Sequence, residues 1–113
     1  MSKKAERQAH TFQVGDIIKQ SNLWGAHTKF YEVVKRSTYY VWLQQLDQDT
    51  HQRDANFEVT NPVPGTRHGE IRRCYAYCDQ RQSSIMRFGP PRSGPWGYLW
   101  DGKPVIDIDP RSL

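Results

Sequence analysis

The chain has 113 residues, 36% of them hydrophobic and 12% aromatic, and it carries 16 Lys and Arg against 12 Asp and Glu. This length fits one domain, because a single core at this size can bury roughly two thirds of the surface that the unfolded chain exposes. No apolar run approaches the ~20 residues of a membrane-spanning helix, and the start, MSKKAERQAH, has no apolar secretory segment. We therefore expect a soluble, cytoplasmic protein that does not bind a membrane.

Residues 1–10 are expected to form a flexible tail ahead of one small β domain over residues 11–113. The first predicted strand is FQVGDIIKQ at 12–20, in which β-branched residues surround a Gly-Asp turn or bulge. The next strand, TKFYEVVKR at 28–36, has apolar side chains on both faces, which is typical of a central strand covered on two sides.

Between these two strands lies the pair Trp24-Gly25. Gly25 permits backbone angles that a Cβ forbids, so the indole of Trp24 can fold over one end of a barrel as a lid. The alternative is that Trp24 belongs to a surface on which nucleic-acid bases stack, a contact worth ~1–3 kcal/mol per base. That surface would also hold Tyr40, Trp42 and Trp96. A small barrel needs some of its rings for the core, which favours the structural role for Trp24.

The third predicted strand, YYVWLQQL at 39–46, places Tyr40 and Trp42 on one face, which we expect to stay partly exposed. The next segment, DQDTHQRDAN at 47–56, is polar without helical periodicity and is predicted to be a loop. It is followed by NFEVTNPVPG, which allows a short edge strand that its prolines stop, because proline cannot donate to a strand ladder.

Two more strands are predicted in the second half of the chain. GEIRRCYAYC at 69–78 alternates Arg73 and Tyr75 with Arg72 and Cys74, and SSIMRF at 83–88 is a shorter candidate. The Gly/Pro-rich stretch GPPRSGPWGYLWDGKP is predicted to be a loop held by its own rings. Short strands at close spacing, without an amphipathic helix, predict an all-β fold. We expect a small five- or six-stranded antiparallel barrel, SH3-like, or a sandwich.

Cys74 and Cys78 are too few for the disulfide framework of a secreted mini-protein, so we expect reduced thiols. On an extended strand their spacing puts the two sulfurs on one face roughly 13 Å apart, too far for one tetrahedral metal ion to bind both. A metal site with His51 or His68 would need a turn between the cysteines. We favour two thiols packed in the core, and we expect no metal or other cofactor.

The sequence offers little support for catalysis. Asp16 and Asp101 each adjoin a glycine and fit turn caps better than an acid/base pair. A cysteine nucleophile paired with His68 lacks any accompanying motif, and no phosphate-binding loop or dinucleotide fingerprint is present. We therefore expect that the protein is not an enzyme.

All of the basic residues between positions 66 and 100 are arginines. Guanidinium pairs with phosphate through a planar fork and stacks on aromatic faces, so this run beside Tyr75 and Tyr77 is a candidate surface for anions or nucleic acid. The alternative is solvated strand faces that keep a small protein soluble. The acidic run before it leaves room for only one basic face. The arginines are Arg67, Arg72, Arg73, Arg81, Arg87 and Arg92, and the acidic run is Asp47, Asp49, Asp54 and Glu58.

The order GDI, WG, FYEVV, NPVPG, GEIRR and YLWDGKP over residues 13–105 resembles a family of small, mostly uncharacterised proteins encoded by bacteriophages and other mobile elements. The resemblance implies a compact β protein from a mobile element, acting in the cytoplasm of a bacterial host cell, and it implies no known reaction. The residues that we interpret as its structural motif are Gly15, Asp16, Trp24, Gly25, Phe30, Tyr31, Trp100, Asp101, Gly102 and Pro104.

Two non-catalytic functions remain open. In the first, the protein binds nucleic acid, or a host complex that contains it, through an arginine and aromatic face. In the second, the same face docks onto a host defence protein, as an anti-CRISPR inhibitor does, with Arg, Tyr and Trp as interface anchors. The predicted binding residues are Arg72, Arg73, Arg81, Arg87, Arg92, Tyr40, Trp42 and Tyr75.

Overall fold

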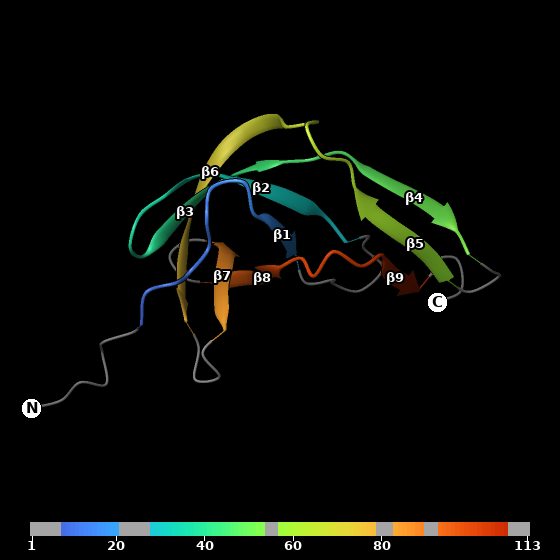
Figure 1. The fold of residues 1–113 in the computed structure, drawn as a ribbon. Helices are drawn as coiled ribbons and strands as arrows, with labels where there is room; N and C mark the ends of the chain where they lie inside the picture. The colour runs from blue at the N-terminus through green and yellow to red at the C-terminus, as the bar shows by residue number, and fades with distance from the viewer. Residues whose placement is uncertain (1–7, 21–27, 54–56, 79–82, 90–92, 109–113) are drawn as a thin grey trace, which may run out of the picture.

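The computed structural model describes residues 8–20, 28–53, 57–78, 83–89 and 93–108, and it confirms the all-β prediction (Figure 1). Six antiparallel strands form a closed barrel, and three others form a small second sheet beside it. In pairing order the barrel strands are β1 (Ile17–Gln20), β2 (Phe30–Arg36), β3 (Tyr40–Gln45), β6 (His68–Cys78), β7 (Ser84–Gly89) and β8 (Ser93–Leu99), and β8 pairs with β1 to close the ring. The second sheet holds β4 (Gln48–Gln52), β5 (Phe57–Pro62) and β9 (Val105–Ile108). Within these ranges, no helix has the length and apolar character needed to cross a membrane.

The barrel interior holds the main apolar core, whose members alternate along the strands as period-two patterning predicts. On β3, Val41 and Leu43 are fully buried, whereas Tyr40 and Trp42 face outward and are half-buried. Burying one such Val or Leu side chain stabilises the fold by ~1.5–3 kcal/mol. The core residues are Phe12, Ile18, Tyr31, Val33, Val41, Leu43, Cys74, Ala76, Met86 and Phe88.

A β-bulge in β2 changes which of its side chains face outward. Val33 pairs with Leu43 and Lys35 pairs with Trp42, so one extra residue, Val34, interrupts the ladder. A bulge shifts the alternation of side chains by one position. Lys35 therefore faces outward, although strict alternation would place it on the same side as the buried Val33.

A wider bulge lies in β6, where residues 69–71 are opposite the single residue Gln44 of β3. Gly69 has a φ of 79°, in the left-handed region that an L side chain rarely adopts, and its carbonyl oxygen accepts the Gln44 amide at 2.9 Å. The bulge ends the regular core ladder at Arg72, which pairs with the buried Leu43 and marks one mouth of the barrel.

The second sheet corrects two predictions for the polar middle of the chain. Residues 48–52 form β4 rather than a loop, because each of them pairs in register with β5. β5 lies between β4 and β9, so it is a central strand and not the predicted edge strand. Pro62 is tolerated in it because β9 pairs only with residues 57–60, so the ladder to β9 needs no donor at the proline.

A second, smaller apolar cluster lies where the chain passes between the barrel and the second sheet. Neighbouring residues of a strand face opposite sides, and on β2 it is Tyr31 that faces the barrel core. Phe30, on the other side, is nevertheless fully buried. The Phe30 ring meets Trp100 edge-on, with 6.0 Å between ring centroids. Leu46, which connects β3 to β4, is also fully buried, and its N–H donates to the Phe30 carbonyl at 2.9 Å. The predicted burial of both faces of this strand is therefore confirmed at Phe30 and Tyr31.

The segment before β1 packs onto the barrel. His10 is only 2% exposed, its Nε2 donates to the Ser37 carbonyl at 2.7 Å, and its Nδ1 accepts the Phe12 N–H at 3.1 Å. These two bonds require the neutral ring with the proton on Nε2, and burial lowers the pKa of His10. The flexible tail predicted for residues 1–10 is therefore too long, because His10 belongs to the folded part.

The Gly/Pro-rich stretch predicted to be a loop contributes the barrel strand β8. Between the pairs Arg87–Trp96 and Gly89–Ser93, β8 takes three steps where β7 takes two, and this bulge accommodates Pro95. Gly97 faces the core, where an added Cβ would lie 2.6 Å from the Met86 sulfur. Glycine is therefore needed here for close packing. β9, which follows, has no counterpart among the predicted strands.

Candidate functional site

Four of the predicted binding residues meet on the outward face of β3 and β6. The register pairs Tyr40 with Tyr75 and Trp42 with Arg73, and directly opposed residues share one face of a sheet. The three aromatic side chains are half-buried, and Arg73 is exposed. We refer to the whole group as the aromatic-basic face: Lys35, Tyr39, Tyr40, Trp42, Arg73, Tyr75 and Tyr77.

Tyr75 is the centre of a connected group of rings. Its centroid lies 5.9 Å from that of Tyr40, edge-on, and 5.4 Å from that of Tyr77. Tyr39, in the loop between β2 and β3, stacks on Tyr75 at 6.4 Å with 16° between the ring planes, and Tyr40 lies 6.5 Å from Trp42. These separations fall within the ~4.5–7 Å at which aromatic pairs attract one another. The rings therefore hold each other in place.

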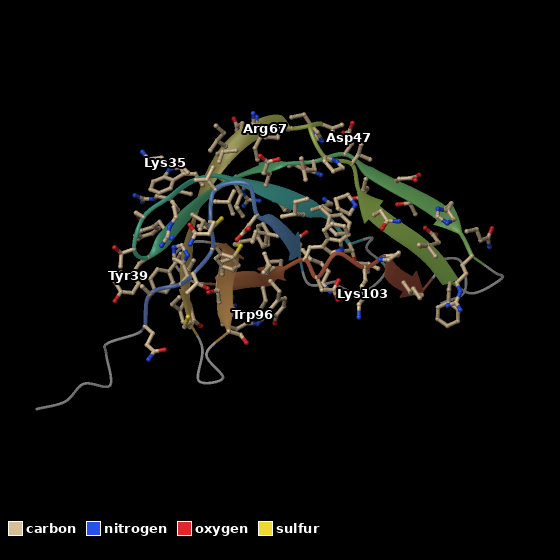
Figure 2. The ribbon with its side chains drawn as sticks, viewed as in Figure 1. Lys35, Tyr39, Asp47, Arg67, Trp96 and Lys103 are labelled. Atoms are coloured by element: carbon tan, nitrogen blue, oxygen red, sulfur yellow. The ribbon has the colours of Figure 1, made fainter. Side chains whose placement is uncertain are left out.

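Two cations lie over these rings. The guanidinium carbon of Arg73 is 4.7 Å from the Tyr40 centroid, and the Lys35 Nζ is 4.7 Å from the Trp42 centroid. Both distances are within the ~6 Å of a cation–π interaction, in which the ring is a neutral partner and leaves the positive charge in place. Figure 2 shows Lys35 and Tyr39 at the side of the barrel away from the second sheet. Sequence reasoning missed Lys35, because only the bulge in β2 brings it beside Trp42.

Arg72 lies on the opposite side of β6 from Arg73, so the prediction that all the arginines share one outer face is wrong. Its side chain turns into the barrel mouth, where it donates to the Phe88 carbonyl at 3.0 Å and lies 5.9 Å from the Phe88 ring. The physical reason is the alternation of the strand: Arg72 pairs with the inward Leu43, and Arg73 with the outward Trp42.

An open pocket of about 390 Å³ lies at this mouth. Burial raises the pKa of the Tyr31 phenol, an effect that the nearby Arg72 charge partly offsets, so the hydroxyl stays protonated at neutral pH. The His68 Nε2 lies 3.0 Å from an Asp47 carboxylate oxygen at the rim. The pocket thus mixes both signs of charge and is not a simple anion site. Its lining is Tyr31, Gln45, His68, Gly69, Glu70 and Arg72.

Arg87 lies on β7, outward, one strand beyond the aromatic-basic face. Its guanidinium carbon is 3.8 Å from the centroid of Trp96, its partner on β8. Other predicted residues lie outside the described part of the chain, namely Arg81, Arg92, Trp24 and Gly25. Of the predicted set, the structure therefore brings together Tyr40, Trp42, Arg73 and Tyr75.

Several of the residues interpreted as a structural motif form turns in the described ranges. Gly15 has a φ of 97°, and the Asp16 carboxylate accepts the Gln13 N–H at 2.8 Å. Gly102 has a φ of 84°, and the Asp101 carboxylate accepts the Lys103 N–H at 2.9 Å. The interpretation of both aspartates as turn residues is thereby confirmed. In the second turn, which leads to Pro104, the Trp100 indole also donates to the Lys103 carbonyl at 2.7 Å.

Both cysteines are free thiols, but only Cys74 is packed in the core; Cys78 is half-buried, so the prediction of two core thiols is confirmed for Cys74 and wrong for Cys78. Cys74 is buried in the core, and burial raises the pKa of its thiol to about 11. The Cys78 thiol donates to the Ala9 carbonyl at 3.2 Å. A protonated buried thiol is a poor nucleophile and a poor metal ligand. Among the described residues, no group of three or more His, Cys, Asp or Glu side chains is placed to hold a metal ion.

Comparison of the chain with protein-family models, with curated proteins and with solved structures finds no match. The chemistry of the site therefore has to be read from its own residues. A row of half-buried rings, with cations over two of them, can stack on flat apolar groups and attract negative charge. Nucleic acid offers both, as bases and as phosphates.

Proposed function

We propose that this is a non-catalytic binding protein of a bacteriophage or mobile element that binds nucleic acid, bare or within a host complex, through the aromatic-basic face. The observation that carries the proposal is the packing of Arg73 over Tyr40 and of Lys35 over Trp42 on one outward surface. Bases stack on aromatic rings regardless of sequence, and cations beside those rings contact the phosphates. No acidic residue is present among the described outward positions of β3 and β6 around these rings.

Salt dependence is the first test, because phosphate contacts release counterions. On a single strand log affinity falls linearly as log salt rises, and each phosphate contact adds about 0.7 to the steepness of this slope. If Lys35, Arg73 and Arg87 all contact phosphates, the slope should be at least about 2. Fluorescence anisotropy with a labelled oligonucleotide at several salt concentrations measures it. Arg73→Ala should lower the slope by about 0.7.

A matched control is available in Arg67, whose side chain is 48% exposed and lies 3.9 Å from the Glu32 carboxylate, away from the aromatic-basic face. Figure 2 places Arg67 at the top of the barrel and Lys35 at its side. Arg67→Ala should leave both the affinity and the slope nearly unchanged. Equal losses in the two arginine variants would mean that only net charge matters, and would contradict a defined site.

The stacking component is tested at Trp42, which lies at the margin of the ring group. Trp42→Ala should weaken binding by ~1–3 kcal/mol, the value of one stacked base. Trp42→Phe should retain most of the affinity, because it keeps an aromatic face. Thermal melting of each variant separates loss of the contact from loss of the fold. No binding of any oligonucleotide at low salt would overturn the proposal.

The second candidate, an inhibitor that docks on a host defence protein, uses the same face. Interlocked Tyr, Trp and Arg side chains are also the residues that dominate protein interfaces. A pull-down from host lysate before and after nuclease treatment distinguishes the two functions. Recovery of one protein regardless of nuclease, together with failure to bind oligonucleotides, would favour the inhibitor.

A further inference from the structure

The aromatic-basic face continues around the barrel onto β7 and β8. Tyr77 pairs with Ile85, and Ile85 pairs with Tyr98, so the three side chains form an outward row across β6, β7 and β8. Two residues further along β7, Arg87 pairs with Trp96, and the guanidinium stacks on the indole at 3.8 Å. We refer to Arg87, Trp96 and Tyr98 as the β7–β8 extension.

The extension is continuous with the aromatic-basic face. Ile85 faces outward but is only 6% exposed, consistent with cover from its flanking partners Tyr77 and Tyr98. The last residue pair between β6 and β7 at this end is Ala76–Met86. If the register is extended by one pair, Arg87 lies opposite Tyr75. The described outward residues along this path, from β3 to β8, include no carboxylate.

This path is strongly curved. It crosses four neighbouring strands of a closed six-stranded barrel, and adjacent strands are only about 4.8 Å apart. Figure 2 shows Lys35 at the upper side of the barrel and Trp96 at its lower side. Duplex DNA has a persistence length of about 150 base pairs and keeps its bases paired inside, so it cannot follow this surface and stack on its rings. A single strand bends freely and exposes its bases.

We propose that the ligand is single-stranded nucleic acid, and that it crosses the barrel strands from Trp42 over Tyr75 to Trp96. Arg73 and Arg87 contact its phosphates, and the rings stack on its bases. The inference rests on the proposed function and adds the strandedness of the ligand and its route. It also assigns binding roles to Trp96 and Tyr98.

The test compares ligand length with variant position. Fluorescence anisotropy is measured with labelled single strands of about 4 and 16 nucleotides, which span the site sizes of small β-barrel binders, and with a duplex of about 16 base pairs. A longer strand reaches the β7–β8 extension, and a short one can bind at Trp42 alone. We expect the long strand to bind most tightly, and the duplex to bind weakly.

Trp96→Ala and Arg87→Ala should each weaken binding of the long strand by about tenfold, with little effect on the short one, since a stacked base or a charge contact is worth ~1–3 kcal/mol. Tyr98→Ala serves as a second variant, because this residue is 40% exposed. Ile106→Ala, at a 53% exposed apolar position on the second sheet, is the control. Melting curves confirm that each variant is folded.

The outcomes separate this inference from the proposed function. Equal affinity for both lengths, with no effect of Trp96→Ala, Arg87→Ala or Tyr98→Ala, would overturn the route while leaving nucleic-acid binding at Trp42 intact. A duplex that binds as tightly as the long single strand would overturn the choice of ligand. If none of the three ligands binds at low salt, the proposed function itself fails, and this inference fails with it.

Discussion

Gly97 should be one of the positions least tolerant of a single added methyl group. It lies on β8 and faces the core, where an ideal Cβ would be 2.6 Å from the Met86 sulfur, 2.9 Å from a Phe88 ring carbon and 3.0 Å from a methyl carbon of Ile18. Ordinary contacts of this kind are 3.4–4 Å long, so Gly97→Ala forces all three neighbours to move. Overpacking of a core in this way costs ~1–3 kcal/mol.

A smaller effect acts in the opposite direction. Alanine restricts the unfolded chain more than glycine does, which stabilises the fold by ~0.4–1 kcal/mol where the backbone angles suit it. The net expectation is a loss of about 1–2 kcal/mol. For a chain of this length, that corresponds to a Tm lowered by roughly 4–8 °C. Urea denaturation should show a lower midpoint with an unchanged m value.

Met86 provides the control, because its sulfur makes the shortest contact to the added methyl group. Met86→Ala alone should cost ~2–5 kcal/mol through the cavity that it leaves. In the double variant the new methyl group enters that cavity. The stability loss of the double variant should therefore be smaller than the sum of the two single losses by ~0.5–3 kcal/mol. A Tm for Gly97→Ala equal to or above that of the parent, or strict additivity with Met86→Ala, would refute the close approach of β8 to the core.

Three further measurements test the fold. Burial lowers the pKa of His10 below 6.5, so the folded state binds fewer protons than the unfolded state. Stability should therefore fall as the pH drops below about 6.5, by at most ~1.4 kcal/mol per pH unit. His10→Gln, which stays neutral, should remove that part of the slope in urea titrations. Asp101→Ala should cost about 1 kcal/mol in thermal melts through the lost Lys103 N–H bond, and Asp101→Asn should cost less. Alkylation followed by mass spectrometry should label Cys78 before Cys74, whose pKa is about 11; the reverse order would contradict the burial of Cys74.

The barrel was predictable because its strands carry apolar residues at period two. The alternation of β3, with Val41 and Leu43 inward and Tyr40 and Trp42 outward, appears directly in its letters. The same argument identified β6 and β7, whereas β2 was predicted from apolar side chains on both of its faces. It also placed Tyr75 on the same side of β6 as Arg73; the pairing of Tyr75 with Tyr40 comes from the structure.

The missed strands lack that signal. β4 has no apolar residue, and its sequence QDTHQ is strand only because β5 pairs with it, with the hydroxyls of Thr50 and Thr60 3.2 Å apart. β8 contains two glycines and a proline, residues that single-sequence reasoning assigns to loops. Its glycine at position 97 is instead required by the closeness of Met86, a tertiary contact that no local pattern encodes.

The charge of the candidate face follows from bulge positions more than from composition. An unbroken β2 would leave Lys35 on the core side with Val33, but the bulge turns it outward onto Trp42. Arg72 and Arg73 are neighbours in the sequence, and the alternation of the strand places one in the barrel mouth and the other over Tyr40. A one-residue shift exchanges the two faces of a strand. Deleting Val34 removes the extra residue, so Lys35 follows Val33 directly and stays opposite Trp42. Binding should therefore survive this deletion in a folded protein, whereas Lys35→Ala should weaken it, and an unchanged affinity in Lys35→Ala would show that Lys35 is not part of the site.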